Sequence, residues 1–158
     1  MTTVGVTAPL VGERDLEVRR LRPADVGDVR RLVDRCSARS LRARFFGFVA
    51  DPAALLRAQV LEAVWEGCAV GALRGGGLAG LAVGVPDGDG RWELAVLVQD
   101  ADQGRGVGER VARVVLGEAA SAGVGVDAYV EAANGPAMRL VRRLTRTAAG
   151  PSLRVVVC

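Results

Sequence analysis

The residues best suited to chemistry are the glycines of a short loop past the middle of the chain. Gly104, Gly106 and Gly108 alternate with other residues after an apolar run, Leu94–Val98, and open an amphipathic stretch. Glycine lets backbone amides approach a ligand closely, and the first turn of a helix adds unpaired N–H groups and a positive dipole end. A strand, a glycine-rich loop and a helix start in this order predict an anion site, most often for phosphate.

Two well-known phosphate loops do not fit this spacing. A Walker A loop ends in Gly-Lys-Ser/Thr, and the chain contains no lysine. A dinucleotide fingerprint needs Gly-x-Gly-x-x-Gly. The sixth position is Glu109 when counted from Gly104 and Val111 when counted from Gly106. The glycine pattern therefore disfavours both ATP and NAD as the ligand of this loop.

The spacing that remains is Gln103-x-x-Gly106-x-Gly108, after a strand that ends at Val98. It resembles the pyrophosphate loop of the GNAT superfamily of N-acetyltransferases, whose pattern is Gln/Arg-x-x-Gly-x-Gly/Ala. A glycine-rich turn that merely closes a strand–helix unit is the alternative interpretation.

A second segment adds to this resemblance. Leu21–Asp25 and Ser37–Gly47 are similar to the opening of bacterial protein-lysine (Pat-like) acetyltransferases. Those proteins often carry Ser-x-x-Ser-x-x-x-Arg-Phe-Phe at this point. The Pat-like segment implies a protein lysine as the acceptor, and the resemblance to the acetyltransferases as a whole covers about Leu16 to Leu144.

The GNAT resemblance implies acetyl-CoA as the acyl donor and cosubstrate. The backbone of Val96–Val98 would pair with the pantetheine arm like an additional strand. Backbone amides of the loop would bind the pyrophosphate, with Gly106 and Gly108 as the motif glycines and Arg105 as a candidate charge contact. The residues implied for the cofactor are Val96, Leu97, Val98, Gln103, Gly104, Arg105, Gly106, Val107, Gly108 and Asn134.

Acetyl transfer to an amine also requires removal of a proton. A free lysine amine has a pKa near ~10.4 and is mostly protonated at neutral pH. Glu93 begins the apolar strand, ten positions before Gln103. A glutamate at the matching position of Pat-like proteins is proposed as the general base, so the resemblance implies this catalytic role for Glu93. An ordinary solvent-facing glutamate at a strand end is the alternative.

The last predicted helix departs from the family pattern. Many relatives carry Asn-x-x-Ala-x-x-x-Tyr there, and the Tyr protonates the leaving thiolate. Asn134 and Ala137 match, but the Tyr position is Val141. The chain's one tyrosine, Tyr129, lies on the neighbouring predicted strand, where we expect core or cross-strand packing. A catalytically weak acyl-CoA-binding regulatory module is therefore an alternative to an enzyme.

Composition narrows the remaining chemistry. The chain has no histidine, which removes Ser-His and Cys-His nucleophiles and most zinc sites, and we expect no metal. The net charge of +3 suits an anionic cosubstrate without arguing for nucleic acid. No apolar run reaches the ~18 residues of a membrane span. Met1–Val11 has no signal-peptide pattern, so we expect a cytoplasmic protein.

Hydrophobic periodicity and turn residues predict an α+β fold. The predicted strands are Leu16–Leu21, Cys68–Leu73, Leu78–Val85, Arg91–Val98, Val124–Val130 and Leu153–Val157. The predicted helices are Pro23 to about Cys36, Ser37–Arg44, Ala53 to about Val64, Val107 to about Gly123, and one that starts at Asn134-Gly135-Pro136. We expect residues 1–15 to be a lead-in and residues 16–158 to be a single GNAT acetyltransferase domain. The resemblance implies a mixed, mostly antiparallel sheet flanked by helices, with a splayed central strand pair at the acyl-CoA slot.

The predicted function is transfer of an acetyl group from acetyl-CoA to a primary amine, most favourably a protein lysine, with a small amine as the alternative. Phe45, Phe46 and Phe48 follow the second predicted helix, and we expect them to anchor the core rather than line an acceptor pocket. Little sequence remains for a final hairpin after the last helix. A homodimer is therefore also expected as an option, because a partner chain would complete the exposed sheet edge.

Overall fold

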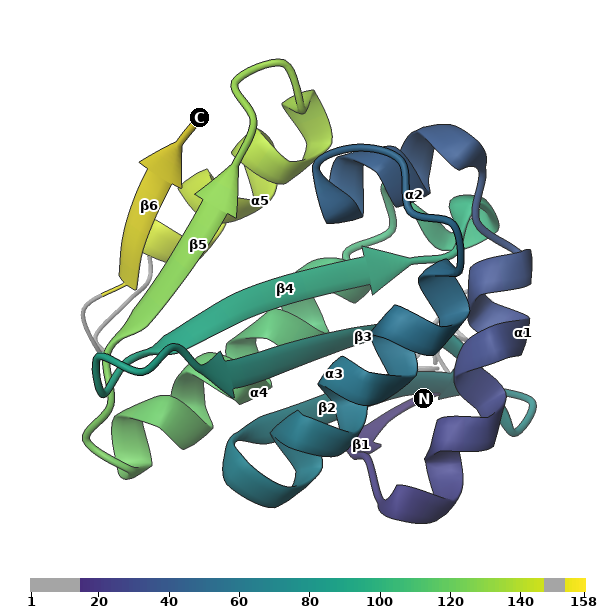
Figure 1. Ribbon diagram of the computed structural model, residues 1–158, viewed down its shortest axis with the longest axis horizontal. Helices are drawn as coiled ribbons and strands as arrows, with labels where there is room; N and C mark the ends of the chain where they lie inside the picture. Colours follow the sequence, from purple (N-terminus) through teal and green to yellow (C-terminus); the bar gives the residue numbers. More distant parts are fainter. Residues whose placement is uncertain (1–14, 147–152) are drawn as a thin grey trace, which may run out of the picture.

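A six-stranded sheet runs through the molecule with its strands in chain order, β1 to β6 (Figure 1). The structure, a computed structural model, describes residues 15–146 and 153–158. The strands are β1 (Leu16–Arg20), β2 (Cys68–Arg74), β3 (Gly77–Pro86), β4 (Trp92–Val98), β5 (Val126–Val130) and β6 (Leu153–Val157). β1 to β4 pair antiparallel, whereas β4–β5 and β5–β6 pair parallel. The mixed, mostly antiparallel sheet of the prediction is confirmed.

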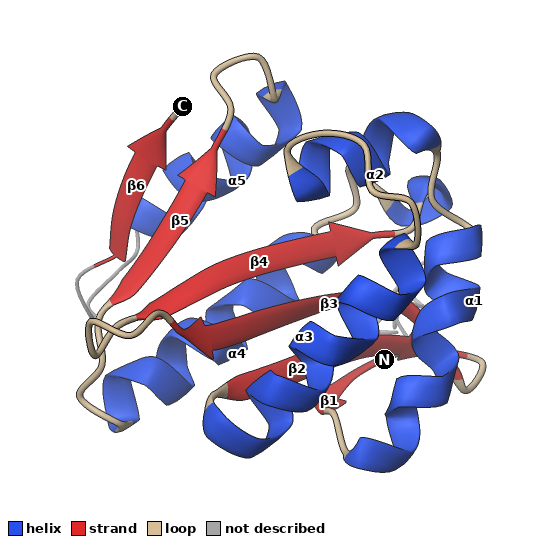
Figure 2. Ribbon diagram, in the orientation of Figure 1, coloured by secondary structure: helices blue, strands red, loops and turns tan. Residues whose placement is uncertain are grey.

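In the part of the chain that the structure describes, five helices flank the sheet (Figure 2). They are α1 (Val29–Asp34), α2 (Ala38–Phe45), α3 (Pro52–Glu66), α4 (Val107–Ser121) and α5 (Gly135–Arg146), with short 3₁₀ turns η1 (Pro23–Asp28) and η2 (Asp100–Asp102). The first predicted helix is divided, because η1 precedes α1. Asp25 accepts hydrogen bonds from the backbone N–H of Arg22 at 2.7 Å and from Arg19 at 2.8 Å, and these bonds tie the first turn back to β1. The predicted lead-in, residues 1–15, lies outside the described residues except for Asp15, so the domain boundaries stay a prediction.

Apolar side chains form one core on each face of the sheet. On the face covered by α1 and α3, the α1/α3 face, the core includes Leu32, Leu56, Val60, Leu81 and Leu97. On the face covered by α4 and α5, it includes Val70, Leu94, Val111, Val115 and Leu144. Side chains alternate along a strand, so Leu94 and Leu97 of β4 point to opposite faces. By the same alternation, Glu93 lies on the α1/α3 face.

β4 and β5 are paired only at their starts. Trp92 lies opposite Val126 and Glu93 opposite Asp127, and beyond these two pairs the strands diverge (Figure 1). Among the described residues, the edge of β4 that faces β5 therefore has no strand partner from residue 94 to residue 98. This divergence is the splayed central strand pair that the sequence resemblance implies.

A buried carboxylate holds the strands together where they part. Asp127 of β5 is 2% exposed and accepts hydrogen bonds from Arg91, which precedes β4, at 2.8 Å and from Arg154 of β6 at 2.7 Å. The Arg154 bonds, with those from Arg91, hold the pKa of Asp127 well below its usual range. Asp127 thus connects three neighbouring segments of the sheet. Sequence reasoning did not find it, although a lone aspartate in an apolar strand is a signal for a buried charge partner.

Candidate active site

The predicted anion loop leads into α4, whose first backbone amides have no side-chain cap. Gly104 and Gly106 have φ of 74° and 78°, a left-handed conformation that disfavours side chains. Gly106 is the N-cap of α4, and no side chain of the described residues caps this helix. The first N–H groups of α4 are therefore available to an anion. Arg105 lies exposed between the two glycines.

Close packing fixes the start of α4 against β3 and β4. A Cβ added at Gly80 of β3 would lie 3.1 Å from the Leu97 carbonyl oxygen and 3.2 Å from Val107. A Cβ at Gly108 would lie 3.4 Å from Val96, an ordinary van der Waals distance. The absence of a side chain at Gly80 thus lets α4 begin directly over the strand that the resemblance assigns to the cofactor.

The turn before the loop is anchored by a second buried carboxylate. Asp102 in η2 is 1% exposed and accepts hydrogen bonds from Arg74 of β2 and from the side chain of Gln99. Gln99 in turn accepts a 2.6 Å hydrogen bond from Arg35 at the end of α1. These contacts fix the path of the chain from β4 into the loop. Asp102 was not among the predicted site residues.

The Gln103 side chain ties the loop to α2. Its Nε2 donates to the Val98 carbonyl at 3.0 Å and to Ser40 Oγ at 3.0 Å. Ser40 donates to Asp100 at 2.9 Å, and Asp100 also accepts from the backbone N–H of Ser37 at 3.0 Å. The Ser37 bond is the main cause of a lowered Asp100 pKa. Of the two serines of the Pat-like segment, Ser37 thus caps α2 and Ser40 attaches it to the glycine loop.

Glu93 lies at the other end of β4, on the α1/α3 face. Its side chain is exposed, and within the part of the chain that the structure describes it has no hydrogen bond or ion pair. Glu93 interacts electrostatically with Arg44 of α2. Burial lowers the pKa of the Arg44 guanidinium to about 10, and the negative charge of Glu93 acts in the opposite direction. The structure therefore brings a cation from α2 close to the predicted base.

The prediction that the three phenylalanines anchor the core is confirmed for Phe45 and wrong for Phe46 and Phe48. Phe46 is 43% exposed and Phe48 is 83% exposed, whereas Phe45 packs against the core on the α1/α3 face. The reason is local: α2 ends at Phe46, which adopts a left-handed conformation with φ of 58° and turns the chain outward. Tyr129 of β5, for which core or cross-strand packing was expected, is 41% exposed and so is not a core residue. It alternates with Ala128, which packs in the core beneath α4 and α5, so Tyr129 lies on the α1/α3 face.

The predicted contacts of α5 are only partly available. Asn134 Oδ1 accepts from the backbone N–H of Ala137 at 3.2 Å and so caps α5, which leaves its amide nitrogen to contact a ligand. Val141 is buried in the core beneath α4 and α5. That position therefore supplies no acid for a leaving thiolate.

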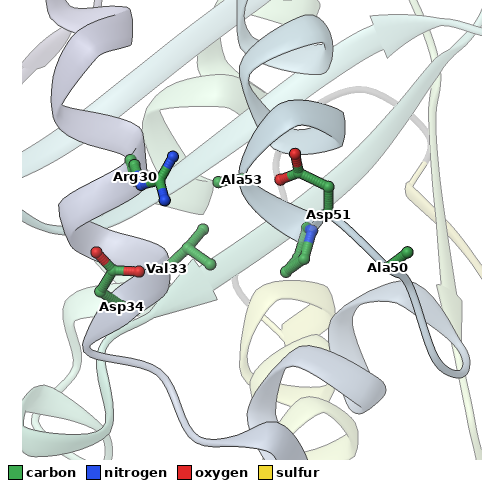
Figure 3. Close-up of a pocket in the computed structure, with 7 residues that line it drawn as sticks. Arg30, Val33, Asp34, Ala50, Asp51 and Ala53 are labelled. Atoms are coloured by element: carbon green, nitrogen blue, oxygen red, sulfur yellow. The ribbon is translucent and has the colours of Figure 1, made fainter.

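A surface hollow lies away from these residues, between α1 and the start of α3 (Figure 3). Figure 3 shows Arg30 and Asp34 on α1 and Asp51 and Ala53 at α3 around it. Asp51 is already used, because its carboxylate accepts from the backbone N–H of Ala54 at 3.0 Å and caps α3. None of the residues that line the hollow belongs to the glycine loop. Among the described residues, no group of His, Cys, Asp and Glu could hold a metal, and no helix is long and apolar enough to cross a membrane.

Comparisons with known proteins agree with this geometry. Residues 36–145 match the acetyltransferase (GNAT) family. No match was found among curated protein sequences. Three solved structures share the fold: an N-acetyltransferase from Staphylococcus aureus Mu50 (13% identity, 82% of each chain, TM-score 0.63), yncA from Salmonella typhimurium with its cofactor acetyl-CoA (20% identity, 82% of this chain and 78% of that chain, TM-score 0.61), and a ribosomal-protein-alanine N-acetyltransferase from Brucella melitensis (19% identity, 81% of this chain and 82% of that chain, TM-score 0.66).

A sheet that opens between two parallel strands, with a glycine loop and a helix start at the end of one of them, defines the class of acyl-CoA-dependent acyltransferases. The family match covers well over half of the chain, so the chain belongs to the acetyltransferase (GNAT) family. It is an acetyl-CoA-dependent acetyltransferase. The identities to the solved structures are low, and that likeness by itself shows the fold.

Proposed function

We propose that this chain acetylates a primary amine, with the side chain of a protein lysine as the favoured acceptor. The observation that carries the proposal is the parting of β4 and β5 directly after Glu93 and Asp127, on the strand that leads into the loop Gln103–Gly108. From residue 93 to residue 98, β4 offers roughly 17 Å of strand at ~3.4 Å per residue. The distance along β4 between Glu93 and the loop supports donor binding at the loop and amine binding near Glu93.

The residues present fit acetyl-CoA, which supplies a thioester as the activated acyl group. The unpaired edge of β4 at Val96 and Leu97 has backbone groups for the pantetheine arm. The uncapped amides of Val107 and Gly108, with Arg105 nearby, suit the pyrophosphate. Holding donor and amine in one orientation is itself catalytic, because well-oriented intramolecular reactions gain up to roughly 7–11 kcal/mol.

The chemical step forms a bond between the amine nitrogen and the acyl carbon and breaks the bond between that carbon and sulfur. The amine must first lose a proton, which Glu93 accepts directly or through water. The nitrogen gives up a second proton to solvent as the bond from carbon to sulfur breaks, and the leaving thiolate takes a proton from solvent, because Val141 supplies none. Tyr129, exposed on the same face as Glu93, is not assigned this role.

Two features favour a protein acceptor over a small amine. Phe46 and Phe48 form an exposed apolar rim beside α2, which suits contact with a polypeptide. The Ser37–Gly47 segment resembles the Pat-like proteins and contributes Ser40 and Arg44 to the network around the site.

Thermal unfolding with acetyl-CoA tests the donor site. At 100 times its dissociation constant the ligand adds roughly 2.7 kcal/mol, which raises the midpoint by about 5–10 °C for a chain of this size. NAD and ATP serve as controls and are expected to give no shift. Gly106→Ala should reduce the acetyl-CoA shift.

Gly88→Ala is the matched control for that variant. Gly88 has a similar φ of 87°, and a Cβ would meet nothing within 4 Å at either glycine. Both variants should lose about 1 kcal/mol of stability from backbone strain. Loss of the acetyl-CoA shift in both, or in neither, would contradict the loop assignment.

Glu93→Gln tests the base. Loss of a positioned general base typically costs 10²–10⁴-fold in rate, so kcat with a lysine peptide should fall by about 100-fold or more. The acetyl-CoA shift should stay unchanged. Glu62→Gln, an exposed glutamate on α3, is the control. An unchanged kcat in Glu93→Gln would remove Glu93 from the mechanism.

A second candidate is an acyl-CoA-binding regulatory module with little turnover. The buried Val141 at the position of the usual acid favours it. Thiol release in the presence of an amine panel separates the two: sustained release supports the enzyme, whereas acetyl-CoA binding without release supports the module.

The outer edge of β6 is a further open feature of the proposed enzyme. β6 pairs with β5 on one side, and Val156 and Val157 are among the exposed large apolar residues. An unpaired edge of this kind can pair with a second copy. Light scattering of the purified protein would give a dimer mass if it does.

A further inference from the structure

Arg44 has an environment unlike that of other arginines in the fold. Its Nη2 donates a 2.6 Å hydrogen bond to Gln59 Oε1 of α3, and its guanidinium carbon lies 4.8 Å from the centre of the Phe45 ring. Its Nε is covered, and among the described residues it has no hydrogen-bond partner. The guanidinium is thus partly desolvated, held in place by neutral groups, and short of an acceptor.

Other arginines of the chain meet a buried carboxylate instead. The pairs are Arg19 with Asp25, Arg74 with Asp102, and Arg154 with Asp127. A desolvated cation without a hydrogen-bonded anion is unfavourable, and a buried donor without an acceptor calls for an explanation. Gln59 satisfies one donor of Arg44 but brings no compensating charge.

Arg44 comes from a helix on the same face of the sheet as Glu93, the residue proposed to receive the acceptor amine. α2 contacts β4, and Leu41 and Phe45 of α2 pack on the same core as Leu97, so α2 lies on the α1/α3 face with Glu93. The charge of Glu93 is the one that acts on Arg44. The residue that follows Phe45 is Phe46, the one described residue other than glycine with a positive φ. Strained backbone of this kind concentrates at functional sites.

We propose that Arg44 binds a carboxylate carried by the acceptor, beside the amine that Glu93 receives. This inference rests on the proposed function and narrows its substrate class. Glu93 and Arg44 present opposite charges on one face, which matches an amine and a carboxylate on the same molecule. In a polypeptide the carboxylate is an aspartate or glutamate next to the acceptor lysine. In a free amino acid it is the α-carboxylate.

The test compares acceptors that differ only in this charge. Blocked peptides with a single lysine carry Glu before or after it, and matched peptides carry Gln. Free lysine and lysinamide form the second pair. For wild type we expect kcat/KM about tenfold higher for the carboxylate member, mainly through KM, since a charge-assisted hydrogen bond to guanidinium is lost in the amide. The pair that shows the difference identifies the source of the carboxylate.

Arg44→Gln should abolish the preference, and Arg44→Lys should retain only part of it, because lysine keeps the charge without the planar fork of guanidinium donors. Arg42→Gln, an exposed arginine on the same helix, should leave the preference at its wild-type value. Equal kcat/KM within every wild-type pair would overturn the proposal, as would a preference that persists in Arg44→Gln.

A stability readout separates this role from a structural one. Arg44→Met keeps the apolar stem and removes the desolvated charge, so its melting temperature should equal or exceed that of wild type while the carboxylate preference is lost. A large fall in melting temperature would instead identify Arg44 as a structural residue. Calorimetric binding of the Glu and Gln peptides gives the same comparison without turnover. Absence of turnover for any amine would overturn the proposed function, whereas equal peptide binding would overturn only the role of Arg44.

Discussion

The two ends of β4 are built in opposite ways. At its end, Asp102 is buried between Arg74 and Gln99, and Gln103 is bonded to Ser40, so the polar groups around the cofactor loop are satisfied within the protein. At its start, Glu93 is exposed and has no hydrogen bond or ion pair among the described residues. Within the same residues the Nε of Arg44, from α2 on that face of the sheet, has no partner, and Phe48, which follows α2, is exposed.

The difference in hydrogen bonding between the two ends of β4 fits the binding of two unlike substrates. A loop whose side chains are already bonded offers its backbone amides without reorganisation, which suits one invariant ligand such as acetyl-CoA. The proposed acceptor segment, with unsatisfied charge and exposed aromatic surface, would complete its contacts on binding the acceptor. We therefore expect changes near the loop to affect donor binding and changes near α2 to affect acceptor use.

The largest effect is expected from Asp127→Asn, because Asp127 lies opposite Glu93 at the start of β4, where β4 and β5 part. Removing its charge leaves Arg91 and Arg154 without their shared carboxylate, and loss of one partner of a buried ion pair costs about 3–5 kcal/mol. We expect a fall of this size in the free energy of unfolding by urea. Asp89→Asn, in the exposed turn before β4, is the control.

The pH dependence gives this prediction its sign. The two arginines hold the pKa of Asp127 well below its usual range, so the carboxylate stabilises the fold above its unfolded pKa of ~3.9. That contribution is lost as pH falls below this value. The difference in unfolding free energy between wild type and Asp127→Asn should therefore narrow between about pH 5 and pH 2. A difference that stays constant would mean that folding does not lower the pKa of Asp127.

The sequence was sufficient for the elements and for the loop. Each predicted strand and helix has a counterpart, because apolar periodicity and Gly or Pro punctuation are local signals. The buried carboxylates were missed for the opposite reason. Asp127 depends on arginines 36 residues before it and 27 residues after it, and only the sheet brings these together.

The aromatic residues were misplaced for another physical reason. Phe46 and Phe48 are apolar, and apolar residues next to a helix are usually buried. Here α2 has eight residues and ends at Phe46 in a left-handed conformation, so the chain leaves the core before Phe48. Composition does not indicate such a reversal. The same applies to Arg44, whose missing partner is defined by packing and not by sequence spacing.

A smaller effect is expected at the tie between the two regions. Gln103→Ala removes the hydrogen bonds to the Val98 carbonyl and to Ser40, and a hydrogen bond contributes about 1 kcal/mol. The loop then needs to be ordered when acetyl-CoA binds, so the dissociation constant should rise about fivefold by calorimetry. Gln59→Ala, whose side chain contacts Arg44 instead, should leave acetyl-CoA binding unchanged. An equal loss in both variants would show that the loop and α2 are not separate in function.

The smallest expected change in stability comes from Phe48→Ser, which sharpens the comparison from the acceptor side. Phe48 is 83% exposed, and surface substitutions of this kind usually change stability by less than about 0.5 kcal/mol. If the aromatic rim binds the polypeptide acceptor, KM for a protein or long peptide should rise several-fold through lost apolar contact, whereas KM for free lysine should not change. Trp65→Ser is the matched control, because Trp65 on α3 is 73% exposed and lies outside this rim. A KM for the polypeptide that is unchanged in Phe48→Ser would assign the exposed phenylalanines no part in acceptor binding.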